Sequence, residues 1–158
     1  MQIQIQPMTR ETVPGVAALE RSCFTQPWSE EAFYAELDNS HAVTLVAVAD
    51  SVAGFVNARN LFGDVYINNI AVAEAFRRRK IAERLLLALE ERIKPFIFIT
   101  LEVRKSNLPA QKLYEKMGYA VAGERKGFYS SPAENALLMT KFGSMPEPVQ
   151  NSKVEGNI

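Results

Sequence analysis

Two segments carry polar residues at places where folds built from strands and helices commonly bind ligands. In the first, an apolar run that ends at Val72 is followed by the basic residues Arg77, Arg78, Arg79 and Lys80, directly before a strong helical pattern. The free N–H groups and the dipole at the start of a helix attract anions, and flanking cations strengthen that attraction. The segment therefore fits a pyrophosphate. A solvated basic turn is the alternative interpretation, because charge runs usually face water.

The second segment places a carboxylate on a predicted strand and a tyrosine on the helix that follows it. Strand alternation puts Glu102 and Arg104 on the same face, opposite the apolar residues of that strand. Glu102 can therefore serve as an acid or base, or it can simply pair with Arg104. Tyr114 lies on the apolar face of its predicted helix, where a tyrosine can be a core residue or a proton donor.

The composition excludes several kinds of site. Cys23 is the only cysteine and His41 the only histidine, so the chain cannot form an internal disulfide or a Cys/His metal cluster, and we expect no metal requirement. Lysine plus arginine equal aspartate plus glutamate at 18 each, which gives no reason to expect nucleic acid or a membrane surface as a partner. The sequence shows neither a signal-peptide pattern nor a membrane-length apolar run, which predicts a cytoplasmic protein.

The hydrophobic periodicity predicts one α/β domain. Strands are expected at about 3–5, 41–49, 52–60, 65–72, 97–103, 119–129 and 136–142. Helices are expected at about 11–23, 30–37, 81–93 and 109–117. The short connections among the strands of 41–72 predict antiparallel neighbours, whereas the helix before 97–103 predicts a strand parallel to its predecessor. Residues 143–158 have nothing to bury and are predicted to form a disordered tail.

The ordered set of motifs resembles the RimI-type ribosomal-protein-alanine N-acetyltransferases of the GNAT superfamily. The matching segments are 24–29, 69–72, 101–107, 113–119 and 125–129. The similarity spans about residues 3–142 in the expected order. It implies the GNAT fold for residues 1–142, with one mixed central sheet of about seven strands flanked by about four helices.

The resemblance also implies a reaction and a set of site residues. An acetyl group would pass from acetyl-CoA to an amine by direct attack, with Glu102 as general base and Tyr114 as general acid. The implied cofactor contacts are Ile70, Ala71, Val72, Arg77, Arg78, Arg79, Lys80, Ile81, Ala82, Asn107 and Tyr114. The implied acceptor contacts are Trp28, Asn69 and Tyr129. In the family the acceptor is the N-terminal alanine of a small-subunit ribosomal protein.

One departure from the family pattern concerns the phosphate-binding turn. Lys80 occupies a position where the family has glycine, whereas Ala82 fits the pattern. Glycine there permits close approach of the backbone to the phosphate and a positive φ. Lys80 can crowd that approach, or, if the turn is already helical, its ammonium can lie against the phosphates as a point charge.

Some alternatives stay open at the level of sequence. Trp28 can be a core anchor instead of an acceptor contact, and Asn107 can serve only as the cap of its own helix. A GNAT enzyme for a small-molecule amine would also fit the motifs. So would a binding module with the same fold that has lost catalysis, although such a module would need neither Glu102 nor Tyr114.

Overall fold

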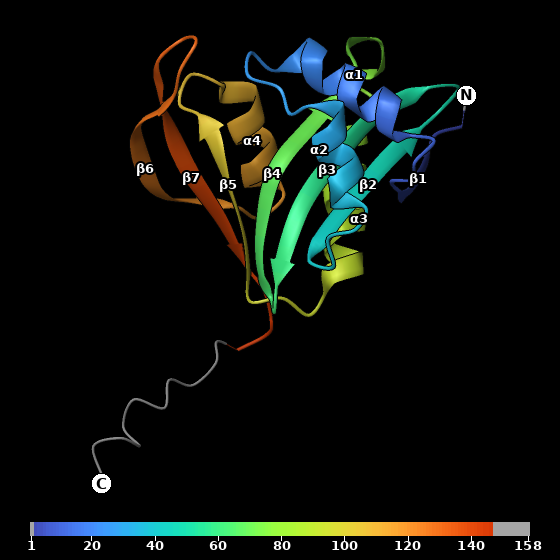
Figure 1. The fold of residues 1–158 in the computed structure, drawn as a ribbon. Coiled ribbons are helices and arrows are strands. Elements are labelled where there is room, and N and C mark those ends of the chain that lie inside the picture. Colours follow the sequence, from blue (N-terminus) through green and yellow to red (C-terminus); the bar gives the residue numbers. More distant parts are fainter. Residues whose placement is uncertain (1, 147–158) are drawn as a thin grey trace, which may run out of the picture.

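Within residues 2–146, which the computed structural model describes, seven strands form one mixed sheet in the order β1-β2-β3-β4-β5-β7-β6 (Figure 1). The strands are β1 (Gln4–Pro7), β2 (Ala42–Val48), β3 (Val52–Leu61), β4 (Asp64–Val72), β5 (Phe98–Arg104), β6 (Ala120–Tyr129) and β7 (Glu134–Phe142). The helices are α1 (Val13–Cys23), α2 (Glu30–Glu36), α3 (Ile81–Ile93) and α4 (Leu108–Lys116), with a short 3₁₀ turn η1 (Glu74–Phe76). None of these helices is long and apolar enough to cross a membrane.

The predicted element order and sheet directions are confirmed. Strands β1 to β4 are antiparallel neighbours, and β5 runs parallel to β4 after the crossover through α3. Local signals fix the helix ends: the Ser29 side chain accepts a hydrogen bond from the Ala32 N–H at the start of α2. Gly118 follows α4 with a φ of 99°, the left-handed conformation that suits glycine at a helix end.

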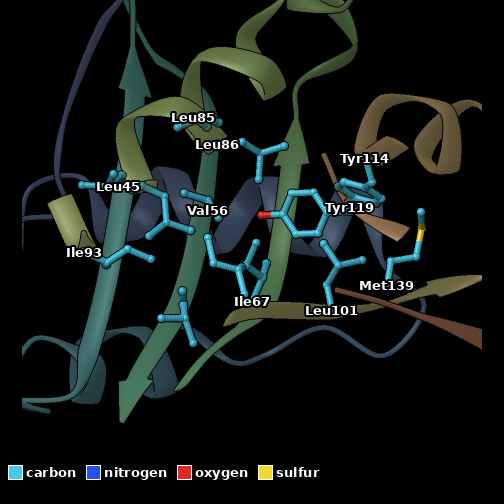
Figure 2. Close-up of a cluster of buried hydrophobic side chains, with 14 of the residues drawn as sticks. Leu45, Val56, Ile67, Leu85, Leu86, Ile93, Leu101, Tyr114, Tyr119 and Met139 are labelled. Atoms are coloured by element: carbon cyan, nitrogen blue, oxygen red, sulfur yellow. The ribbon is translucent and has the colours of Figure 1, made fainter. Parts of the chain in front are cut away.

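Helices cover the two faces of the sheet unequally. On one face, α1 and α2 pack over a core that includes Val16, Phe33 and Phe55. On the other face, α3 and α4 cover a larger core, in which Leu85 and Leu89 of α3 meet aliphatic residues of the central strands. Figure 2 shows part of this second core, with Tyr114 and Tyr119 beside Leu101 and Met139. Tyr114 is thus anchored in the main core.

Strands β4 and β5 separate along their length, which opens the sheet at its centre. They pair only at Asp64–Phe98, Val65–Ile99 and Tyr66–Thr100. Beyond that point β5 continues alongside β7, and β4 continues alongside β3. The carboxyl ends of the two parallel strands therefore diverge, and such divergence is where α/β folds place ligands.

A β-bulge marks the same stretch of β4. Asn57 of β3 pairs with Asn69 while the next residue, Ala58, pairs with Ile67, so Asn68 has no partner of its own in the ladder.

The predicted tail begins with residues that are still bound to the domain. The N–H groups of Gly143 and Met145 donate to the carbonyls of Ile97 and Phe96, at 2.8 and 3.0 Å. The rest of that predicted tail, residues 147–158, lies outside the described residues.

Candidate active site

Two adjacent cavities lie at the diverging ends of β4 and β5. The first has a volume of about 630 Å³ and the second about 570 Å³. The residues that line both are Cys23, Phe24, Ile70, Asn107, Ala110 and Tyr114. The two cavities therefore adjoin along a wall that includes Tyr114.

The first cavity is lined by the start of α3 and the basic turn before it. Ile81 and Ala82 contribute from the helix, and Ile70, Ala71 and Val72 contribute from β4. Lys80 is the N-cap residue, and its side chain makes no capping hydrogen bond. The first N–H groups of α3 have no acceptor within their own helix, so they are available to an anion.

The turn adopts the backbone conformation that glycine favours without containing glycine. Lys80 has φ 58° and ψ 29°, and Arg78 has φ 66°. The idea that Lys80 sits in an already helical turn is therefore wrong: its own backbone is left-handed, and the helix begins one residue later. For a residue with a Cβ this conformation costs about 1–2 kcal/mol, which the surrounding turn must offset.

The four basic residues of the turn have different surroundings. Arg77, Arg78 and Lys80 line the first cavity, and the Arg77 Nε donates to the Val72 carbonyl at 3.3 Å. Within residues 2–146, neither Arg78 nor Lys80 forms an ion pair. Arg79 does not line this cavity, and its guanidinium lies over the ring of Phe76, 5.5 Å from the centroid.

The second cavity contains Glu102, which is paired across the sheet. The Arg125 Nε lies 3.3 Å from the Glu102 Oε1, and the Glu102 side chain is 24% exposed. The alternative that Glu102 pairs with Arg104 is wrong, since Arg104 pairs with Glu134 at 3.2 Å. The two residues lie two positions apart on one strand, whereas β6 and β7 present closer partners of opposite charge. In the part of the chain that the structure describes, no three His, Cys, Asp or Glu residues are grouped to hold a metal ion.

Tyr114 belongs to the core and to both cavities. It is only 6% exposed and its ring lies 5.9 Å from that of Tyr119. Burial raises the pKa of the Tyr114 hydroxyl well above its ordinary value, and the nearby Tyr129 raises it further. The phenol therefore keeps its proton across the physiological pH range. Tyr114 can therefore be both a core residue and a proton donor.

Asn107 caps its own helix and also lines the cavities. Its Oδ1 accepts a hydrogen bond from the Ala110 N–H at 3.2 Å and so caps α4. The same residue lines both cavities.

The three residues predicted for the acceptor side all line the second cavity. Trp28 is half-buried and packs against Phe33, with ring centroids 5.5 Å apart, so it is also a core anchor. Asn69 is buried on β4. Tyr129 lies under the Arg104 guanidinium, 4.4 Å from its ring centroid.

Sequence reasoning missed Glu20, which lines the second cavity and is 1% exposed. Its position offered a signal: Val13, Val16 and Ala17 form the buried face of α1, and Glu20 continues that face at helical spacing. A carboxylate on an apolar helical face needs buried partners. Sequence reasoning also missed Gln26, whose Nε2 donates a hydrogen bond to the Ser130 Oγ at 3.0 Å.

Comparisons with known proteins agree with the predicted resemblance. Residues 13–119 match the family model of the acetyltransferase (GNAT) family. A Bacillus subtilis protein assigned as a [ribosomal protein bS18]-alanine N-acetyltransferase is 38% identical over 136 residues, 84% of this chain and 90% of that protein. The Salmonella typhimurium [ribosomal protein bS18]-alanine N-acetyltransferase is 29% identical over 131 residues, 80% of this chain and 88% of that protein.

Solved structures show the same fold. The crystal structure of the ribosomal-protein-S18-alanine N-acetyltransferase from Escherichia coli aligns with a TM-score of 0.83 at 24% identity, over 94% of this chain and 99% of that one. Arabidopsis thaliana NAA60 in complex with a bisubstrate analogue aligns with a TM-score of 0.80 at 23% identity, over 90% of this chain and all of that one. The chain is an acetyltransferase and belongs to the GNAT family.

Proposed function

We propose that this chain acetylates the α-amine of a protein N-terminus, specifically the N-terminal alanine of a small-subunit ribosomal protein in the cytoplasm, and uses acetyl-CoA as the acetyl donor. The observation that carries the proposal is the meeting of two cavities at Tyr114, one beside a cationic helix start and the other beside Glu102. The names of the relatives, which act on the alanine of ribosomal protein bS18, support the choice of acceptor.

The lining of the first cavity suits acetyl-CoA in charge and polarity. Coenzyme A joins an extended arm to a pyrophosphate, and the thioester at the end of that arm supplies the activated acetyl group. The start of α3 offers N–H groups, and Arg78 and Lys80 offer cations for the phosphates. Aliphatic side chains, among them Ile70 and Leu113, line the remainder of the cavity. Asn107 would contact the arm, since it lines this cavity.

Glu102 is proposed to accept the proton of the attacking amine. An α-amine has a solution pKa of about 8, so much of it is protonated at neutral pH and must lose a proton before it attacks. The Glu102 side chain is 24% exposed, so it can take that proton directly or through a water molecule. Trp28, Asn69 and Tyr129 would orient the acceptor in the same cavity.

Tyr114 is proposed to donate a proton to the departing thiolate. Its raised pKa keeps the proton on the phenol until the thiolate forms. A thiol ordinarily has a lower pKa than a phenol, so this transfer is uphill and depends on a close hydrogen bond between the Tyr114 hydroxyl and the departing sulfur. No acyl-enzyme is needed.

The backbone of β4 is proposed to polarise the thioester carbonyl. The bulge at Asn68 interrupts the regular ladder two residues before Ile70, and Ile70, Ala71 and Val72 line the first cavity. Backbone N–H groups aimed at a carbonyl oxygen stabilise the negative charge that develops there, as an oxyanion hole does.

A substrate panel tests the proposal. The protein is incubated with acetyl-CoA and three sets of acceptors: peptides that start with alanine, the same peptides with other first residues, and free amines such as alaninamide and a polyamine. Mass spectrometry then locates the acetyl group. We expect the alanine-initiated ribosomal peptide to react fastest, at its α-amine. Faster acetylation of the free amines would identify a small-molecule enzyme, and no acetylation of any acceptor would indicate a binding module.

A further inference from the structure

The buried carboxylate of Glu20 has no part in the chemistry proposed above. Glu20 lies near the end of α1 and is 1% exposed, yet it lines the second cavity. Taking a carboxylate out of water is costly unless hydrogen bonds replace the water. The hydrogen-bond partners of Glu20 therefore indicate its role.

Glu20 accepts hydrogen bonds from two other walls of the cavity. Its Oε2 lies 2.9 Å from the Trp28 backbone nitrogen, and the Asn69 Nδ2 lies 2.7 Å from both carboxylate oxygens. Trp28 belongs to the loop between α1 and α2, whereas Asn69 belongs to β4. One carboxylate thus joins three segments of the chain at a single point.

The hydrogen bonds to Glu20 matter because both partners, Trp28 and Asn69, lie at the proposed acceptor site. Trp28 and Asn69 both line the cavity proposed for the acceptor, and Asn69 directly precedes Ile70, which lines both cavities. A change in the distance between the loop and β4 would move the acceptor relative to the thioester. Displacements of about 1 Å in such an arrangement can reduce a rate about a hundredfold.

We infer that Glu20 is a positioning residue, which holds the Trp28 loop against β4 so that the acceptor amine and the reacting end of the donor stay aligned. This inference rests on the proposed function. Glu20 does not itself serve as the base, because both its oxygens already accept hydrogen bonds and almost none of it reaches solvent. Glu102 is the carboxylate that an amine can reach.

The test uses Glu20→Gln, which keeps the size of the side chain but replaces one acceptor with an N–H donor facing other donors. Trp28 is the only tryptophan in the chain, so its fluorescence reports on the loop without any assay of activity. We expect the peptide kcat/KM to fall by about tenfold or more, because loosened hydrogen bonds to a charged group let the acceptor move out of alignment. Trp28 emission should shift to longer wavelength and become more accessible to acrylamide. The affinity for acetyl-CoA should stay within about twofold of wild type, since Glu20 does not line the first cavity.

Two further variants separate positioning from general destabilisation. Glu36→Gln neutralises another buried glutamate, whose partner is Arg59 and which does not line the acceptor cavity. Glu36→Gln should leave the peptide kcat/KM and Trp28 emission unchanged. The double variant Glu20→Gln with Asn69→Asp reverses donor and acceptor across the pair, so it should restore much of the Trp28 signal.

The outcomes distinguish this inference from the proposed function. If wild type fails to acetylate peptides but Glu20→Gln still alters Trp28 emission, the proposed function is wrong and the anchoring of the loop stands. If Glu20→Gln lowers kcat alone while Trp28 emission is unchanged, Glu20 takes part in the chemistry and the inference is overturned. Equal effects of Glu20→Gln and Glu36→Gln, or no recovery of Trp28 emission in the double variant, would also overturn it.

Discussion

The Gln26 Nε2 donates a hydrogen bond to the Ser130 Oγ at 3.0 Å and joins two loops that are 104 positions apart in sequence. Gln26 belongs to the loop between α1 and α2, and Ser130 directly follows β6. Gln26 lines the second cavity, and so do Phe128 and Tyr129 at the end of β6, directly before Ser130. The bond thus sets the spacing between the two sides of the proposed acceptor site.

Breaking this bond should affect the acceptor and not the donor. We expect Ser130→Ala and Gln26→Ala each to raise the peptide KM by less than about tenfold, because an exposed hydrogen bond contributes about 0.5–1.5 kcal/mol. The affinity for acetyl-CoA, measured by calorimetry, should not change. If both residues act only through this hydrogen bond, the peptide KM of the double variant should equal that of either single variant. Strictly additive effects would show that the residues act separately.

Glu102→Gln removes the proposed base and keeps the shape of the side chain. Turnover should fall by roughly a hundred- to ten-thousand-fold, as is typical when a proton-transfer group is lost. Higher pH should rescue the variant in part, because more of the acceptor amine is already deprotonated above a pKa of about 8. The measurement is kcat against pH for wild type and variant with one peptide.

Glu124→Gln is a suitable control for that experiment. Glu124 lies on β6 and pairs with Lys105 at 3.1 Å, and it lines neither cavity. The turnover of Glu124→Gln should stay near that of wild type at every pH. A deficit of Glu102→Gln that does not shrink as the pH rises would argue against a base at this position.

Tyr114→Phe removes one hydroxyl and keeps the ring in the core. The fold should survive while turnover falls about a hundredfold or more, because departure of the thiolate loses its proton donor. High pH should give little rescue, since a free amine does not supply a proton to the leaving group. The raised pKa of Tyr114 predicts in addition that wild type does not lose its proton donor in mildly alkaline buffer.

Tyr119→Phe provides a matched control for Tyr114→Phe. Among the described residues the buried Tyr119 hydroxyl has no hydrogen-bond partner, and its ring packs against Tyr114. Loss of an unpartnered buried hydroxyl should be neutral or mildly stabilising, with turnover unchanged. Equal losses in the two variants would mean that disturbed packing, and not a lost donor, explains the effect.

Lys80 can be dissected with two substitutions. Lys80→Ala removes the cation but keeps a Cβ in the left-handed conformation, whereas Lys80→Gly also relieves that conformation. We expect Lys80→Gly to bind acetyl-CoA at least as tightly as wild type and Lys80→Ala to bind it several-fold more weakly. The glycine variant should also melt a few degrees above the alanine variant. Calorimetry and thermal melts check both points, and weaker binding by Lys80→Gly than by Lys80→Ala would contradict this account.

The elements that local signals define could be predicted from the sequence. Short connections fixed the antiparallel pairs, and the order of motifs placed Glu102 and Tyr114 at one site. The partner of Glu102 could not be predicted, because Arg125 reaches it only through the register of β6 on β7. The left-handed backbone of Lys80 and the stacking of Arg79 on Phe76 depend likewise on the folded turn.

The last prediction concerns the effect of pH on stability through Glu20. Burial raises the pKa of the Glu20 carboxyl, although the hydrogen bonds from Trp28 and Asn69 act in the opposite direction. The folded protein therefore binds this proton more tightly than the unfolded chain. Its contribution to stability is complete below the ordinary glutamate pKa and is lost as the pH rises through the folded value.

Glu20→Gln cannot titrate, so the free energy of unfolding of wild type relative to this variant should fall as the pH is raised from about 4 toward neutrality. Denaturant unfolding of both proteins at several pH values measures this difference, and the other titrating groups largely cancel in the comparison. A carboxylate that weakens the fold at neutral pH and yet orders the acceptor site is the expected compromise between stability and function. A difference that stays constant, or that grows in favour of wild type as the pH rises, would show that the hydrogen bonds outweigh burial at Glu20.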